Sequence, residues 1–148
     1  MARSVKRCSR PSRLSRQAPP LHFSTLQGML KGFMDLVFEH QGRFYVLDYK
    51  SNYLGDGAEA YGPEALATAM IQHRYDLQYQ LYTLALHRYL RHRMADYRYE
   101  DHFGGVIYLF LRGVDANDPQ SGVFSTRPDA ELIEKMDNLF AARTEEVV

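Results

Sequence analysis

Two short segments rich in β-branched and aromatic residues lie on either side of a polar break in the first third of the chain. The pattern runs from Gly28 to Lys50, and the break is His40-Gln41-Gly42-Arg43. A glycine in a short polar break between two such segments is typical of a tight hairpin turn. We therefore predict two antiparallel strands joined at Gln41 and Gly42.

A helical pattern follows a glycine-rich loop. The loop covers Gly55 to Gly62, and Pro63 begins a stretch that we expect to be one helix as far as about Met94. Apolar residues recur on one face of this stretch, and its C-terminal end is basic, as the helix dipole favours. The residues expected on the apolar face are Leu77, Leu81, Tyr82, Leu84, Ala85, Tyr89 and Leu90.

The last third of the chain contains two further strand patterns and a second helix pattern. Val106 to Leu111 is an almost continuous apolar run, too short for a helix, and predicts a central strand buried on both faces. Val123 to Thr126 is expected to be an edge strand, and Asp129 to Ala142 an amphipathic helix. The predicted order is strand, strand, helix, strand, helix.

Composition limits the class of protein. The chain has 148 residues, of which 45% are hydrophobic and 24% charged, and these values indicate one globular domain. Cys8 is the only cysteine, so no disulfide framework can form within a monomer, and we expect a cytoplasmic location. The apolar runs fall short of the roughly 18 residues that a membrane span requires.

Charge is distributed unevenly along the chain. The first acidic residue is Asp35, and residues 1–34 contain seven of the 18 Lys and Arg residues. Residues 1–20 are rich in Arg, Ser and Pro and are expected to be a disordered basic tail, with a domain over residues 21–148. Three interpretations of the tail stay open: an arm that touches nucleic acid, an organelle transit peptide, or a start that is not native.

Two acidic residues fall within the hairpin pattern. If Gln41 and Gly42 form the turn, the numbers of opposed residues sum to 83, which places Asp35 directly across from Asp48. Two like charges in that arrangement destabilise a sheet unless something compensates them. A divalent cation is the candidate, and oxygen ligands favour Mg²⁺ or Mn²⁺.

Lys50 lies two residues beyond Asp48 on the same strand face. A metal-bound water, a phosphate and a lysine ammonium at one place would form a hydrolytic constellation. In the alternative interpretation, Asp48 and Lys50 are a solvent-facing pair. A register shift of one residue would also move Asp35 to the other face.

The helix predicted from Pro63 to about Met94 also carries candidate site residues. Gln78 and Tyr82 are four residues apart and therefore share a helix face. The alternative is that Tyr82 is a core tyrosine and Gln78 a surface residue. The histidines of this region are expected to be solvated rather than metal ligands: His73, His87 and His92.

Three segments carry a resemblance to a known family: Gly32 to Asp35, Leu47 to Asn52, and Gln78 to Tyr82. Together they resemble the RecB-type nucleases of the PD-(D/E)XK superfamily, and the similarity extends from Leu26 to Phe140. The resemblance implies an α/β fold with a restriction-endonuclease-like core, in which helices flank a central mixed β-sheet.

The same resemblance implies roles for the residues of the predicted hairpin. Asp35 and Asp48 would be metal-binding carboxylates, the backbone carbonyl of Tyr49 a further metal ligand, and Lys50 the catalytic lysine. The expected cofactor is Mg²⁺, with Mn²⁺ as an alternative.

On the helix, Gln78 and Tyr82 match the family's Gln-x-x-x-Tyr motif, which is associated with the positioning of DNA. The implied activity is endo- and exonucleolytic cleavage of single-stranded or unwound DNA. The implied partners are subunits of the RecC and RecD type and the RecA recombinase.

The chain also departs from the family pattern. Family members carry a histidine metal ligand on a helix well upstream of the first aspartate, and His22 does not match that motif. The 34 residues before Asp35 are too few for the upstream segment, so we expect a partial domain that lacks the family's first helix and binds metal weakly. No Walker-type loop is present, which argues against ATPase and helicase activity. The alternative function is a catalytically silent module that binds RecA, partner subunits or DNA.

Overall fold

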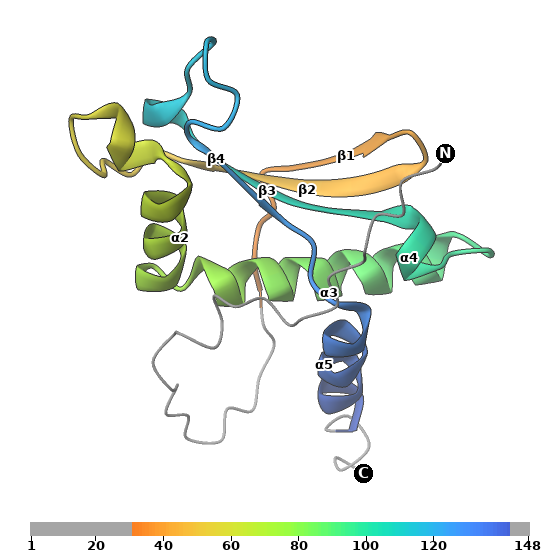
Figure 1. Cartoon of the computed structure of the whole chain (residues 1–148). Helices are drawn as coiled ribbons and strands as arrows, with labels where there is room; N and C mark the ends of the chain where they lie inside the picture. Colours follow the sequence, from red (N-terminus) through yellow and green to blue (C-terminus); the bar gives the residue numbers. More distant parts are fainter. Residues whose placement is uncertain (1–30, 143–148) are drawn as a thin grey trace, which may run out of the picture.

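The computed structural model describes residues 31–142 (Figure 1). The predicted tail, His22 and the start of the hairpin pattern at Gly28 lie outside these residues. The helices and strands are β1 Leu36–His40, β2 Arg43–Lys50, a 3₁₀ turn at Ala58–Tyr61, α2 Pro63–Gln72, α3 Tyr75–Arg93, α4 Tyr99–His102, β3 Phe103–Phe110, a 3₁₀ turn at Leu111–Gly113, β4 Val123–Thr126 and α5 Ala130–Ala142.

The four strands form one mixed sheet in the order β1-β2-β3-β4. Strands β2 and β3 are parallel, whereas β1 pairs with β2 and β3 pairs with β4 in antiparallel fashion. The connection from β2 to β3 contains α2, α3 and α4, as a parallel pair requires a long crossover. The predicted α/β class with a mixed sheet and flanking helices is confirmed.

The β1–β2 hairpin has the predicted turn and register. Gln41 and Gly42 both have positive φ angles, 52° and 77°, the combination that a two-residue type I′ turn needs. Glu39 accepts a hydrogen bond of 2.7 Å from the backbone N–H of Gly42. Leu36 pairs with Leu47, as the predicted sum of 83 requires.

The single helix predicted from Pro63 to Met94 is wrong, because two helices occupy this stretch. α2 ends at Gln72, and Arg74 has left-handed backbone angles, φ 56° and ψ 29°, immediately before α3. Neither glycine nor proline marks this break, so the sequence pattern contains no signal for it. The break lets α2 and α3 run in different directions beneath the sheet (Figure 1).

The face that α3 buries also differs from the prediction. Leu84 and Leu90 are buried as expected, but Ala85 and Tyr89 are exposed. Several polar side chains are buried in place of the expected apolar ones: Asp76, Gln80, Thr83 and His87. Hydrophobic periodicity cannot identify such a face, because partners such as Arg74 for Asp76 and Tyr97 for His87 are set by the fold and not by the apolar pattern.

Helices cover one face of the sheet, and in Figure 1 α2, α3 and α5 all lie on that side. The core on this face contains Val46, Val106, Tyr108 and Phe110, all fully buried. On β3, Ile107 and Leu109, which point away from the helices, are only half-buried. The prediction that this strand is buried on both faces is therefore wrong within residues 31–142. No helix of this part of the chain covers the sheet face opposite α2, α3 and α5.

The edge strand and the final helix agree with the sequence pattern. β4 has the predicted bounds, Val123–Thr126. α5 begins at Ala130, one residue after the predicted start, and Asp129 caps it by accepting a hydrogen bond of 2.8 Å from the N–H of Glu131. Among the described residues, no helix is long and apolar enough to cross a membrane.

His87 is buried, contrary to the expectation that it is solvated. Its side chain lies on the core face of α3, and its Nδ1 is 3.1 Å from the hydroxyl of Tyr97. Burial lowers the pKa of His87, and the positive charge of Arg91 lowers it further. The neutral imidazole is therefore the form that the folded protein prefers.

This burial predicts that acid destabilises the fold through His87. The unfolded chain binds a proton at His87 near the ordinary pKa of about 6.5, and the folded chain binds it less readily, so the free energy of unfolding falls as the pH drops below that value. Urea unfolding at pH 7.5 and 5.5 should show a smaller loss for His87→Gln than for the wild type. The exposed His92, exchanged for Gln, is the control. Equal losses in the wild type and His87→Gln would contradict the prediction.

Candidate active site

The two predicted carboxylates lie next to each other at the open end of the β1–β2 hairpin. Asp35 comes immediately before β1, and the hairpin register, extended by one residue, places it across from Asp48. Oδ2 of Asp35 accepts a hydrogen bond of 2.9 Å from the backbone N–H of Tyr49. The exposed Asp35 carboxylate is thus tied to β2 beside the buried Asp48.

Asp48 and Lys50 form a buried ion pair rather than a solvent-facing one. Oδ2 of Asp48 is 2.6 Å from Nζ of Lys50, and the two side chains are 5% and 11% exposed. Burial raises the pKa of Asp48; Lys50 opposes this effect, and the nearby charge of Asp35 adds to it. The solvent-facing alternative is therefore excluded.

Gln78 connects Lys50 to the rest of the site. Its Oε1 accepts hydrogen bonds from Nζ of Lys50 and from the hydroxyl of Tyr108, each of 3.1 Å. Its Nε2 donates to the hydroxyl of Tyr82 at 2.9 Å, and that hydroxyl donates to the backbone carbonyl of Phe33. Gln78 is not a surface residue, because its amide links α3 to β2 and β3 and, through Tyr82, to the segment before β1.

Tyr82 is only partly buried, so it is not a fully enclosed core tyrosine. Burial raises the pKa of its hydroxyl, and the negative charge of Asp48 raises it further. The phenol therefore stays protonated and can donate its hydrogen bond to Phe33.

The oxygen atoms of this region form a donor set suited to a hard divalent cation. Asp35 and Asp48 supply carboxylates, and the backbone carbonyl of Tyr49, the residue after Asp48 on β2, is the further oxygen that the family resemblance implies. Oδ2 of Asp48 is buried and accepts no hydrogen bond of ordinary geometry. Residues 31–142 contain no cluster of three His, Cys, Asp or Glu side chains that could hold a metal. The residues fit an ion such as Mg²⁺, which takes one or two carboxylates and keeps several waters.

A groove of about 400 Å³ lies beside the site along α3. Gln78 and Tyr82 line it together with two basic residues, Lys31 and Arg74. Its remaining walls are mostly apolar and include Leu77. Leu77, Leu81, Tyr82 and Ala85, which the sequence pattern predicted to be core, thus line an open groove beside the site, whereas Leu84 and Leu90 of the same predicted face are buried.

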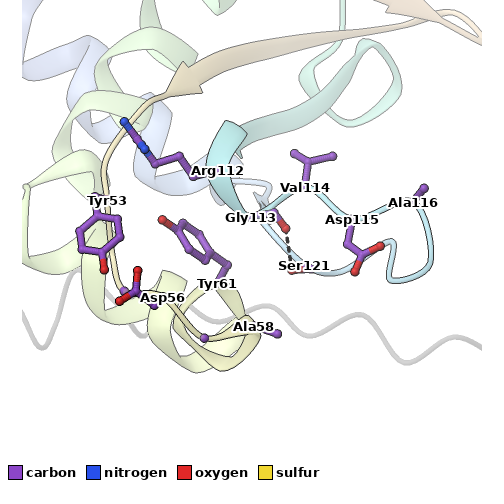
Figure 2. A pocket seen from close by; sticks show the side chains of 12 residues that line it. Tyr53, Asp56, Ala58, Tyr61, Arg112, Gly113, Val114, Asp115, Ala116 and Ser121 are labelled. Carbon is purple, nitrogen blue, oxygen red and sulfur yellow. Dashed lines mark hydrogen bonds between the residues drawn. The ribbon is translucent and has the colours of Figure 1, made fainter.

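A second pocket, of about 440 Å³, lies where the loop after β2 meets the loop after β3 (Figure 2). Tyr53, Tyr61 and Arg112 point toward it, and Arg112 donates from Nε to the carbonyl of Ser51 at 2.9 Å. None of the site residues predicted from the sequence lines this pocket.

Two aromatic residues of the site were missed by the sequence analysis. Nζ of Lys50 lies 3.9 Å from the ring centroid of Tyr75 and 5.1 Å from that of Tyr108. Tyr75 is the first residue of α3 and directly follows the unpredicted helix break. In sequence, an aromatic residue in a helix or a buried strand is indistinguishable from ordinary core, so no signal marked either of them.

The hydroxyl of Tyr82 should contribute to stability through its two hydrogen bonds. Tyr82→Phe removes the hydroxyl and leaves the Phe33 carbonyl without this donor, so we expect a loss of about 1 kcal/mol in the free energy of unfolding. Urea unfolding measures this loss, with the exposed Tyr89, exchanged for Phe, as the control on the same helix. Equal stabilities of the two variants would refute the network.

Comparison with known proteins identifies the family of this chain. The sequence profile of the PD-(D/E)XK nuclease superfamily matches residues 1–148. The RecBCD enzyme subunit RecB of Escherichia coli strain K12 is 67% identical over 131 residues, which are 88% of this chain and 11% of that protein.

Two further relatives have the same name and lower identities. RecB of Haemophilus influenzae is 52% identical over 120 residues, 81% of this chain and 10% of the relative. RecB of Mycobacterium tuberculosis strain H37Rv is 44% identical over 122 residues, 77% of this chain and 11% of the relative. The chain thus spans about a tenth of the length of each RecB subunit that it matches. With a family profile that matches its whole length, the chain belongs to the PD-(D/E)XK nuclease superfamily.

Proposed function

We propose that this chain is a nuclease domain that hydrolyses phosphodiester bonds in DNA with a divalent metal ion, Mg²⁺ or alternatively Mn²⁺. The observation that carries the proposal is the position of Asp35 beside the buried pair of Asp48 and Lys50. Two adjacent acids, one of them buried, are costly for a sheet, and the ammonium of Lys50 offsets only part of that cost, so a bound cation would complete the compensation. PD-(D/E)XK nucleases generally use divalent metal ions, which matches this donor set.

Asp35, Asp48 and the backbone carbonyl of Tyr49 would hold the ion. When bound, a divalent ion lowers the pKa of a coordinated water and neutralises negative charge on the phosphate. Asp48 must be ionised to act as a ligand, and its raised pKa means that protons compete for it above the usual range of an aspartate. Metal affinity should accordingly weaken as the pH falls.

Lys50 is the residue that we propose to act on the reacting phosphate and the attacking water. Its ammonium provides positive charge and N–H donors where negative charge develops in the transition state. Gln78 holds one of these N–H groups at 3.1 Å, so the lysine is oriented before substrate arrives. Such preorganisation avoids the cost of ordering a long side chain during the reaction.

The groove beside the site is suited to a DNA strand. Lys31 and Arg74 line it, and Lys31 supplies positive charge for the phosphate backbone, whereas the guanidinium of Arg74 is already paired with Asp76 at 3.3 Å. Gln78 and Tyr82 lie between this groove and the carboxylates, so a strand in the groove would pass the proposed metal site. We therefore propose single-stranded or unwound DNA as the substrate.

The names of the relatives support a role in a larger assembly. Each is described as the RecB subunit of a RecBCD enzyme, and this chain matches about a tenth of each subunit. We propose that the domain acts in DNA repair and recombination in the cytoplasm, as an exodeoxyribonuclease V type nuclease with subunits of the RecC and RecD type. Contact with RecA is a further proposal that rests on the resemblance alone.

Cleavage of end-labelled single-stranded DNA tests the proposed activity. The wild-type chain should cleave with Mg²⁺ or Mn²⁺ and stop when EDTA removes the metal. Asp48→Ala and Lys50→Gln should each lower the rate at least about 100-fold, because each removes a group that acts in the transition state. Glu134→Gln, an exposed acid on α5, is the matched control and should cleave like the wild type.

Two results would contradict the nuclease assignment. If both Asp48→Ala and Lys50→Gln still cleave DNA like the wild type, the cleavage does not come from the proposed site. A folded wild-type chain that binds single-stranded DNA but cleaves it with neither metal would instead be the catalytically silent interaction module.

A further inference from the structure

The ammonium of Lys50 is enclosed by four groups from three different elements. Oδ2 of Asp48 lies 2.6 Å from Nζ, Oε1 of Gln78 3.1 Å, and the ring centroids of Tyr75 and Tyr108 3.9 Å and 5.1 Å. A lysine ammonium has three N–H groups, and two of these contacts are with oxygen acceptors. The Tyr75 ring is the nearer of the two aromatic groups and closes one side of the enclosure.

The Tyr75 ring is itself held in place. Its hydroxyl donates a hydrogen bond of 3.2 Å to Oδ1 of Asn52, two residues beyond Lys50. The ring stacks on Tyr108 with a centroid distance of 5.8 Å and on His73 with a distance of 5.3 Å. The left-handed turn at Arg74 precedes Tyr75 directly and sets where α3 begins. The ring thus has a hydrogen-bond partner at its hydroxyl and two stacked neighbours.

A cation over an aromatic face within about 6 Å is attracted by the ring quadrupole, most strongly when water is excluded. The Lys50 side chain is 11% exposed, so water screens this contact little. Asp48 is also a proposed metal ligand, and an ion that binds it competes with Lys50 for the same carboxylate. The contacts with Tyr75, Tyr108 and Gln78 do not depend on that carboxylate, and the Tyr75 ring is the nearer of the two aromatic groups.

We propose that Tyr75 is a positioning residue that holds the ammonium of Lys50 through the face of its ring. The face of the Tyr75 ring determines the position of the Lys50 ammonium, whereas the Tyr75 hydroxyl only holds the ring in place. The effect of this Tyr75 contact on catalysis rests on the proposed nuclease function. The position of the Lys50 ammonium can be measured without any nuclease activity.

The position is tested by NMR of the full chain with ¹³C-labelled lysine. The sequence has four lysines, Lys6, Lys31, Lys50 and Lys135, so the spectrum is simple, and Lys50→Met identifies the signal of interest. Protons held over an aromatic face are shifted upfield by the ring current. The ε-methylene signal of Lys50 should be upfield in the wild type and in Tyr75→Phe. It should return toward the position of the exposed Lys135 in Tyr75→Leu.

The catalytic consequence is tested by kcat and KM for cleavage of single-stranded DNA. Tyr75→Leu should lower kcat about tenfold with little change in KM, a loss equivalent to about 1.4 kcal/mol of transition-state stabilisation. Tyr75→Phe should restore most of this kcat because it retains the ring face. Tyr89→Leu removes an exposed tyrosine from the same helix and should leave kcat unchanged. Circular dichroism confirms that each variant is folded.

The outcomes separate this inference from the proposed function. An unshifted Lys50 signal in the wild type, or a Tyr75→Phe variant that behaves like Tyr75→Leu, would overturn the positioning role. A normal kcat in a folded Tyr75→Leu would overturn its catalytic importance. If the wild type does not cleave DNA but the Lys50 signal shifts as described, the proposed function fails and the positioning role stands.

Discussion

The two-residue turn at Gln41 and Gly42 is the constraint on which the site depends. Both residues have positive φ angles, and the turn fixes the pairing of β1 with β2. A slip of one residue would turn every side chain of β1 to the other face of the sheet. The register instead places Asp35 beside Asp48, at the cost of two like charges next to each other. The ammonium of Lys50 offsets part of that cost.

Helix α3 supplies the residues that contact Lys50 from the other side. The position of this helix depends on the helix break that precedes it. Because the chain turns at Arg74, Tyr75 and Gln78 contact Lys50 from the helix side. Gln78 joins β2, β3 and α3 through one amide group, and Tyr82 extends the network to the backbone before β1. The amide of Gln78 and the hydroxyls of Tyr82 and Tyr108 thus satisfy one another, as buried polar groups must, and Oδ2 of Asp48 is paired with the ammonium of Lys50.

Features that depend on neighbouring residues in the sequence could be predicted correctly. The Gly42 turn and the alternation of side chains were enough to place Asp35 against Asp48, and apolar runs located the strands. Features that depend on tertiary partners were not predictable. The helix break at Arg74 has no glycine or proline signal, and His87 is buried because the fold supplies Tyr97 as its partner. Tyr75 was missed because its role depends on that same break.

The proposed nuclease activity requires that Asp35 and Asp48 form one metal site. Isothermal titration calorimetry with Mn²⁺ on the purified chain tests it most directly, with circular dichroism as the check on folding. We expect saturable binding to the wild type that is lost in both Asp35→Asn and Asp48→Asn and retained in Glu134→Gln. Binding that is equally strong in a folded Asp48→Asn variant, or absent from the folded wild type, would contradict it.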